Sequence, residues 1–146
     1  MRRLVVLSAL ALSAGTVPAD EWMVRQKLAS RFADARDAVV MAIENRGLVV
    51  NYTSHIGDML QRTGADIGAS RQVFAQAEII EFCSASLSRK MMEIDPHNIV
   101  LCPFAISIYT LPGETDTTWV AYRKPQGGAA KLVEPLLGEI VAEAGR

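Results

Sequence analysis

Residues 99–122 read IVLCPFAISIYTLPGETDTTWVAY and hold two β-prone runs around a turn. The first run, Ile99 to Leu111, is apolar and β-branched, and the dipeptide Cys102-Pro103 interrupts it near its start. Pro112 to Asp116 has the residues of a turn, and Thr117 to Tyr122 follows as a second strand-like run. Two such runs joined by a short turn predict a β-hairpin, so this stretch places a β-sheet at the centre of the fold.

Outward from the hairpin, strand and helix patterns alternate along the chain. Strands are expected at residues 22–31, 48–52 and 74–83, and helices at residues 33–46, 56–63, between Cys83 and Asp95, and at about 132–145. The order is therefore β-α-β-α-β-α-β-β-α. Strands and helices in this order predict an α+β two-layer sandwich, with helices packed on one face of a mixed β-sheet.

Two of the expected helices have features that the structure can test. The helix at 33–46 is followed by Gly47, which sits where a left-handed residue would end it. The C-terminal helix contains Pro135, expected in its first turn, where a missing N–H costs little. The apolar stripe of the first helix consists of Phe32, Ala35, Val39, Ala42 and Ile43.

The first 19 residues have the three parts of a secretory signal peptide. Met1 to Arg3 is basic, Leu4 to Gly15 is apolar, and Val17-Pro18-Ala19 supplies the small residues of a cleavage site. The apolar run is shorter than the roughly 20 residues that cross a bilayer as a helix. We therefore expect cleavage near Ala19, a single domain at residues 20–146 that is not integral to the membrane, and a periplasmic or secreted location.

The charge of the mature chain limits its partners. Removal of the two arginines of the leader leaves 13 basic and 16 acidic residues, a formal net charge of −3. A mildly acidic domain lacks the basic face that nucleic acid requires, so we expect no nucleic-acid partner.

Cys83 and Cys102 are the only cysteines of the chain. In an oxidising compartment such a pair can form a bridge, hold a metal or cycle between redox states. Cys83 ends one expected strand and Cys102 opens another. If the two strands are antiparallel, the sulfurs can come within bonding reach, and if they are adjacent and parallel the sulfurs lie apart. A structural disulfide is the first interpretation. Two buried free thiols, or a functional pair, are the alternatives.

His55 lies where a strand gives way to a helix, which makes it the candidate ligand-binding residue. His97 follows a proline turn, where an exposed histidine is expected. No cofactor is the first expectation, and haem or copper are the alternatives, because histidine and cysteine together provide the ligand types for copper, zinc or haem iron. The candidate metal ligands are His55, Cys83 and Cys102, to which Met91 and Met92 could add soft sulfur.

The sequence contains no recognisable catalytic motif. It has neither a Gly-x-Ser-x-Gly elbow nor a phosphate-binding glycine loop. Glu78 and Glu81 have opposite parity on one expected strand, so they face opposite sides and do not form an acid/base pair. The serines at 84, 86 and 88 fit helix caps better than nucleophiles. We assign no catalytic residue and expect a binding domain rather than an enzyme.

From about Lys27 to Pro125 the chain resembles the bacterial family called domain of unknown function 302. The matching segments are GLVV at 47–50 with His55 after it, IEFC at 80–83, IDP at 94–96, CPFAISIY at 102–109 and YRKP at 122–125. The resemblance implies a two-layer α+β fold that tends to form homodimers. It places this chain in an exported branch that has both cysteines, and it implies no reaction.

Together these observations favour an exported, non-enzymatic binding or accessory domain. A Cys83–Cys102 disulfide would stabilise it, and a small molecule or metal would bind near His55. A thiol-redox or sulfur-carrier protein using the two cysteines is the second hypothesis. A haem or copper site made from His55 and the cysteines is the third.

Overall fold

A five-stranded sheet forms the centre of the fold in the computed structural model, which describes residues 22–69 and 71–146. The strand order is β1-β5-β4-β3-β2, and every neighbouring pair is antiparallel. The expected signal peptide lies outside the described residues. The strands are β1 (Met23–Leu28), β2 (Val49–Ser54), β3 (Gln76–Cys83), β4 (Phe104–Thr110) and β5 (Thr118–Arg123).

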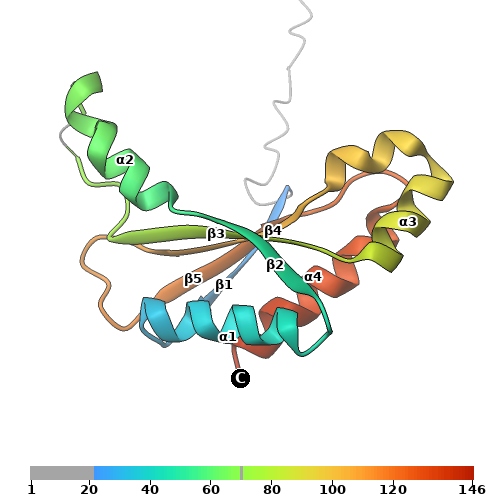
Figure 1. Ribbon diagram of the computed structural model, residues 1–146. Coiled ribbons are helices and arrows are strands. Elements are labelled where there is room, and N and C mark those ends of the chain that lie inside the picture. Colours follow the sequence, from blue (N-terminus) through green and yellow to red (C-terminus); the bar gives the residue numbers. More distant parts are fainter. Residues whose placement is uncertain (1–21, 70) are drawn as a thin grey trace, which may run out of the picture.

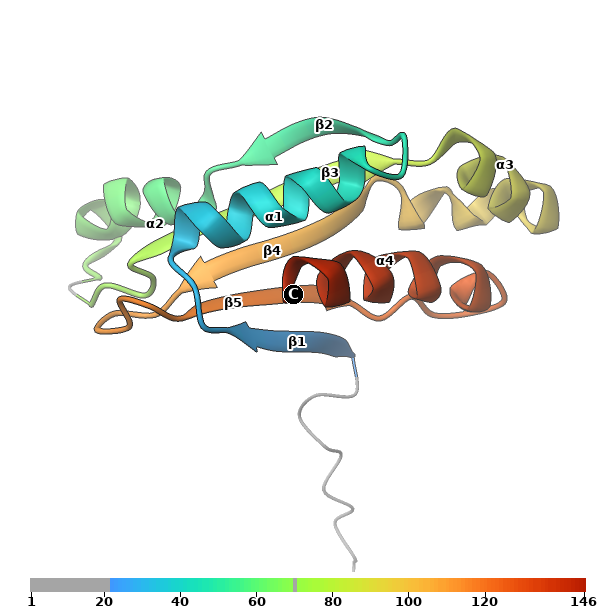
Figure 2. The ribbon, with the colours of Figure 1, turned by 90° about the horizontal axis from the view of Figure 1, so that it is seen from below.

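Two helices, α1 (Phe32–Glu44) and α4 (Ala130–Ala144), lie side by side against one face of the sheet (Figures 1 and 2). The shorter helices α2 (Ile56–Gly64) and α3 (Ala85–Ile94) lie at opposite ends of the sheet (Figure 1). On the face opposite α1 and α4, the start of α2 packs against Ala77 at one end of β3, and no other helix among the described residues lies on that face (Figure 1). The single-turn 3₁₀ helix η1 (Ala65–Ile67) follows α2, and the longer η2 (Pro96–Leu101) follows α3.

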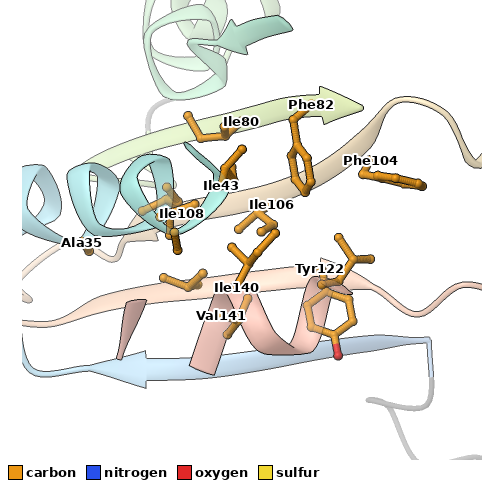
Figure 3. Close-up of a cluster of buried hydrophobic side chains, with 14 of the residues drawn as sticks. Ala35, Ile43, Ile80, Phe82, Phe104, Ile106, Ile108, Tyr122, Ile140 and Val141 are labelled. Carbon is orange, nitrogen blue, oxygen red and sulfur yellow. The ribbon is translucent and has the colours of Figure 1, made fainter. Parts of the chain in front are cut away.

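The core lies between the sheet and the α1–α4 pair (Figure 3). Alternation along β4 buries Phe104, Ile106 and Ile108, each at most 2% exposed. Each fully buried side chain of this size contributes about 1.5–3 kcal/mol. The apolar stripe that the sequence predicts for α1 is the buried face of that helix, as the side chains of Ala35 and Ile43 illustrate in Figure 3.

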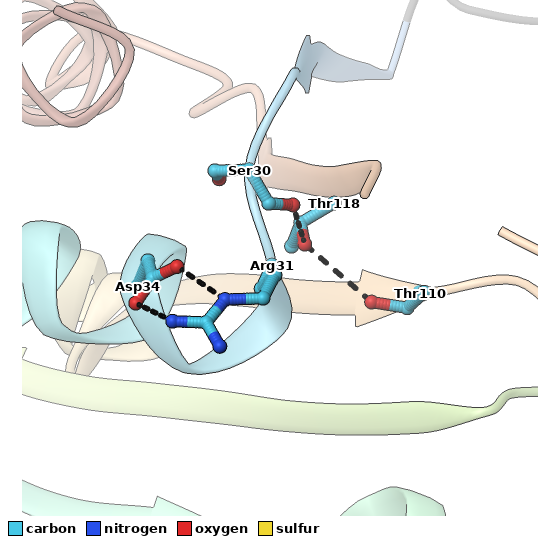
Figure 4. A network of polar contacts seen from close by, with 5 residues as sticks. All are labelled: Ser30, Arg31, Asp34, Thr110 and Thr118. Carbon is cyan, nitrogen blue, oxygen red and sulfur yellow. Dashed lines mark hydrogen bonds and ion pairs between the residues drawn. The ribbon is translucent and has the colours of Figure 1, made fainter. Parts of the chain in front are cut away.

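A polar network ties the β1–α1 connection to the hairpin (Figure 4). The fully buried Thr118 hydroxyl donates to the Ser30 carbonyl oxygen at 2.9 Å, and it lies 3.5 Å from the Thr110 hydroxyl. Next to this network, the Arg31 guanidinium donates two hydrogen bonds to the Asp34 carboxylate in the first turn of α1, with Nε 2.9 Å from one of its oxygens. Hydrogen bonds therefore fix the entry into α1 in place of a side-chain cap on the helix.

The α+β two-layer class and the element order are confirmed, and the sheet differs from the sequence-based expectation in one respect. It is antiparallel throughout, whereas a mixed sheet was expected, because the β2–β3, β3–β4 and β4–β5 connections each return the chain to an antiparallel neighbour, and β1 pairs antiparallel with β5. Gly47 has a φ of +70°, as predicted for the residue that ends the α1 segment. None of the helices in the described part of the chain is long and apolar enough to cross a membrane.

Two local expectations were wrong. The expected strand from Ile99 begins only at Phe104, because Pro96 starts the 3₁₀ helix η2 and Asp95 caps it by accepting from the His97 N–H at 2.9 Å. Pro103 lacks the N–H that a ladder needs. Pro135 lies inside α4 and not in its first turn, because the helix begins at Ala130.

Candidate ligand-binding site

The sheet face opposite α1 and α4 carries a row of mostly small side chains, here called the floor. Ser107 of β4 pairs with Ala121 of β5 and with Ile79 of β3, so the three residues form one row across the sheet. Strand side chains alternate between faces, and the neighbours of Ser107 along β4, Ile106 and Ile108, point into the core. The row therefore faces away from α1 and α4.

Aromatic side chains stand beside this floor and are here called the wall. The next row pairs Tyr109 of β4 with Trp119 of β5 and with Ala77 of β3. The Tyr109 and Trp119 rings stack with centroids 6.5 Å apart and planes inclined by 10°. Phe74, just before β3, meets Tyr109 edge-on at 5.5 Å. Such aromatic contacts are favourable beyond the area they bury, and they hold the wall in one arrangement.

A depression of about 260 Å³, here called the open-face hollow, lies over this floor and against Tyr109 and Phe74; Trp119 stands behind Tyr109 and does not line it. Its lining is almost entirely apolar. The lining residues are Trp22, Met23, Ile56, Phe74, Ala77, Glu78, Ile79, Ser107, Ile108, Tyr109, Ala121, Tyr122 and Arg123.

Cationic side chains stand at the edge of the wall. The Arg25 guanidinium and the Lys27 ammonium lie 5.6 and 5.4 Å from the centre of the Trp119 ring. Glu114 accepts from the Trp119 indole N–H at 3.0 Å and lies 3.6 Å from the Lys27 ammonium. Two kinds of contact therefore hold Trp119 in place: its N–H donates to a carboxylate, and its ring lies beside two cations.

His55 lies at the N-terminus of α2, one residue before Ile56, which lines the hollow. The imidazole itself is not part of the lining. Its Nδ1 lies 3.3 Å from a carboxylate oxygen of Glu78, and Glu78 pairs with the core residue Ile108, so this contact is on the side of the sheet that carries α1 and α4. The second Glu78 oxygen is buried without a hydrogen-bond partner among the described residues.

Cys83 and Cys102 lie together at the other end of the sheet. Phe82 pairs with Phe104, so the last residue of β3 comes next to the segment that leads into β4. Both sulfurs are free, half-buried thiols, and the predicted disulfide is not formed in this structure. Burial raises the pKa of the Cys83 thiol, and the nearby Cys102 raises it further. The Ser88 hydroxyl lies 3.3 Å from the Cys102 sulfur.

The structure does not bring His55 to the cysteines. Ser54, the neighbour of His55, pairs with Ile79, whereas Val49 at the far end of β2 pairs with Cys83. Four residues of β3 separate these positions, which is about 13 Å at the usual rise of an antiparallel strand. In residues 22–69 and 71–146, no three His, Cys, Asp or Glu side chains gather in a way that could hold a metal ion.

The remaining candidates lie apart from both places. His97 is exposed in η2, as expected for a turn histidine. Met91 is fully buried and belongs to the core, so its sulfur is a packing group, and Met92 is half-buried beside it in α3.

Sequence reasoning missed the open-face hollow. The sequence feature that corresponds to it is the alternate set of strand positions that face away from the core. These positions hold the small residues Ala77, Ser107 and Ala121 among the aromatic residues Phe74, Tyr109 and Trp119. The sequence shows each of these residues, but only the cross-strand register shows that they are neighbours.

Comparison with known proteins gives a family and a fold. The model of the family described as "Domain of unknown function DUF302" matches residues 24–146. The crystal structure of an uncharacterized conserved protein, DUF302, from Bacillus stearothermophilus has a TM-score of 0.67 at 12% sequence identity, covering 86% of this chain and 99% of that one. At this identity the likeness shows the fold alone. The search of curated proteins finds no match.

Proposed function

This chain belongs to the DUF302 family, a domain of unknown function, and we propose that it is an exported binding domain that holds a small, largely apolar molecule in the open-face hollow. The single observation that carries the proposal is the apolar depression on the sheet face opposite α1 and α4, bordered at one end by Ile56 of α2.

The shape of the hollow indicates the kind of ligand. Its volume of about 260 Å³ is just below the roughly 300–1,000 Å³ of pockets for drug-sized molecules, which suits a compound of one or two rings. Tyr109 and Phe74 offer aromatic side chains at its edge, and the floor of Ala121 and Ser107 leaves room for a ligand. Burial of apolar ligand surface here would contribute about 25 cal/mol per Å².

A fluorescence titration with a neutral planar probe, N-phenyl-1-naphthylamine, tests this function. We expect saturable enhancement with one site per chain. The substitution Ser107→Phe fills the floor and should weaken binding at least tenfold. Ser86→Phe, on the exposed surface of α3, is the matched control and should leave binding unchanged. Equal binding by both variants, or no saturable signal from the wild type, would remove the hollow as the site.

The Cys83–Cys102 disulfide belongs to the proposal as a stabilising staple. Its support is that the two strands are antiparallel neighbours and that the thiols are close enough for Cys102 to raise the pKa of Cys83. A raised pKa is the opposite of what an attacking thiol needs, which favours the staple over the thiol-redox or sulfur-carrier alternative. Mass spectrometry of alkylated native protein tests the staple, and two alkylated cysteines in protein from the oxidising compartment would exclude it.

Export and homodimer formation complete the proposal. The support for export is the N-terminal sequence pattern, and N-terminal sequencing of the mature protein should begin at Asp20. The support for a dimer is the family resemblance together with the sheet face opposite α1 and α4. Light scattering coupled to size-exclusion chromatography measures the mass, and a monomer at micromolar concentration would exclude a stable dimer.

A further inference from the structure

A second depression lies at the end of the sheet near Cys102, distinct in most of its lining from the open-face hollow. It measures about 200 Å³ and is here called the end pocket. Its walls come from η2, the start of β4, the end of β5 with the segment after it, and the first half of α4. The lining residues are Val100, Leu101, Pro103, Phe104, Ala105, Arg123, Lys124, Pro125, Gln126, Val133 and Leu137.

The end pocket has an apolar floor made of core side chains. Phe104, Val133 and Leu137 are 2%, 1% and 3% exposed, and all three belong to the core between the sheet and α4. Phe104 also meets Phe82 edge-on at 5.8 Å. Because well-packed side chains form this floor, an apolar group entering the pocket would meet a preformed surface and would require little reorganisation.

The rim of the end pocket is cationic. Arg123 ends β5 and Lys124 follows it, and both residues line the pocket; Arg123 also lines the open-face hollow. The lining has no aspartate or glutamate, and neither cation forms an ion pair with a carboxylate within the described residues. Some other cations of the fold are paired, as Arg46 is with Glu143 at 2.6 Å. Gln126 adds an amide to the same rim.

We propose that the end pocket is a binding site for a small amphipathic carboxylate. The carboxylate lies between Arg123 and Lys124, and the apolar tail lies on Phe104, Val133 and Leu137. An arginine offers a planar fork of donors that matches a carboxylate, and the lysine adds a point charge. The buried floor selects against fully hydrated anions such as acetate, and the two cations select against neutral molecules with the same tail.

Octanoate, 1-octanol and acetate test the inference on the mature chain. In NMR titrations of ¹⁵N-labelled protein, octanoate should shift amide signals at residues 100–105 and 123–126, and these shifts should saturate. Acetate should cause no saturable shifts, and 1-octanol should bind at least fivefold more weakly. Rising ionic strength should weaken octanoate binding, because the rim charges are screened.

Substitutions separate the end pocket from the open-face hollow. Lys124→Ala should weaken octanoate binding at least fivefold, while Lys90→Ala, an exposed lysine of α3, should not change it. Lys124→Ala should also leave N-phenyl-1-naphthylamine binding unchanged, because Lys124 does not line the hollow. If octanoate binds with shifts centred on Ile79 and Ser107, or binds equally to both lysine variants, the inference is wrong. Absence of saturable octanoate shifts at millimolar concentration would also overturn it, whatever the probe titration shows.

Discussion

Cys83 and Cys102 lie at the same end of two adjacent antiparallel strands, close enough for Cys102 to raise the pKa of the Cys83 thiol. The strand register fixes this proximity, since Phe82 and Phe104 pair one step further into the sheet. Two different predictions follow from the same proximity, one for the oxidised pair and one for the reduced pair.

Oxidation of the pair should stabilise the fold. A bridge closing a loop of about 20 residues is worth roughly 3 kcal/mol in the chain-entropy model. Urea unfolding with and without a reductant measures the difference, and the reduced protein should unfold at lower urea. The double variant Cys83→Ser/Cys102→Ser should be insensitive to reductant. An unchanged wild-type midpoint would show that the sulfurs do not bridge.

In the reduced protein, Cys83 should be a slow nucleophile. Its pKa lies above the ordinary value because of burial and the neighbouring thiol, so the thiolate fraction at a given pH is lowered. The rate of its alkylation by iodoacetamide should therefore rise at higher pH than that of a free cysteine peptide. Peptide mass spectrometry of quenched samples follows Cys83 separately from Cys102. Alkylation faster than the peptide control would revive the thiol-redox hypothesis.

Gly57 should be intolerant of a side chain. A Cβ at this position would lie 2.8 Å from the Ala77 backbone nitrogen and 3.1 Å from its carbonyl oxygen, where α2 packs against β3. Overpacking of this kind typically costs about 1–3 kcal/mol, so Gly57→Ala should lower the free energy of unfolding by that amount. Gly128→Ala, whose Cβ would meet nothing within 4 Å, is the control. Since Ile56 lines the open-face hollow, Gly57→Ala should also weaken probe binding there.

Thr118→Val should leave the Ser30 carbonyl oxygen without its donor. The Thr118 hydroxyl is fully buried and donates to that oxygen at 2.9 Å. Loss of the donor to this partly buried acceptor costs about 1 kcal/mol, which chemical denaturation can measure. Thr115→Val, in the exposed turn, is the control and should change stability little. A stable Thr118→Val variant would mean that the network in Figure 4 does not contribute to folding.

Acid should loosen the contact between α1 and α4. The hydrogen bond from Arg46 at 2.6 Å is the largest cause of a lowered Glu143 pKa, and Asn45 adds a second hydrogen bond. A depressed pKa in the folded state means that the ionised carboxylate stabilises the fold above the unfolded pKa, and that this contribution is lost as the pH falls through the folded pKa. The urea midpoint of Arg46→Met should depend less on pH between 3 and 6 than the wild-type midpoint. Parallel pH profiles would contradict this.

The local periodicity of the sequence predicts the order of elements, because burial on one face of each element shows directly in residue spacing. Phe32, Ala35 and Val39 are examples, since their helical spacing marks the buried face of α1. Glu78 and Glu81 likewise face opposite sides of β3, as their parity predicts, since Glu78 pairs with the core residue Ile108 and Glu81 pairs with Ala105.

Properties that depend on long-range register could not be predicted from spacing. The hollow exists because Ala121, Ser107 and Ile79 align across three strands. The residue spacing within any one strand does not predict that alignment. The same register separates His55 from Cys83, although each lies at the end of an expected strand. The apolar run from Ile99 to Leu101 was interpreted as strand because its composition is β-prone, but the prolines on both sides and the Asp95 cap favour a 3₁₀ helix.

The strand β2 lies at the edge of the sheet, and its register with β3 shifts between Val50 and Tyr52, which leaves Asn51 without a partner in the ladder. A bulge bends and twists an edge strand, so a second chain cannot align its backbone groups along it. The bulge therefore disfavours edge-to-edge pairing of neighbouring molecules along β2 at high local concentration. Deletion of Asn51 would straighten this edge and give it the flat, templating form from which amyloid-like stacking begins.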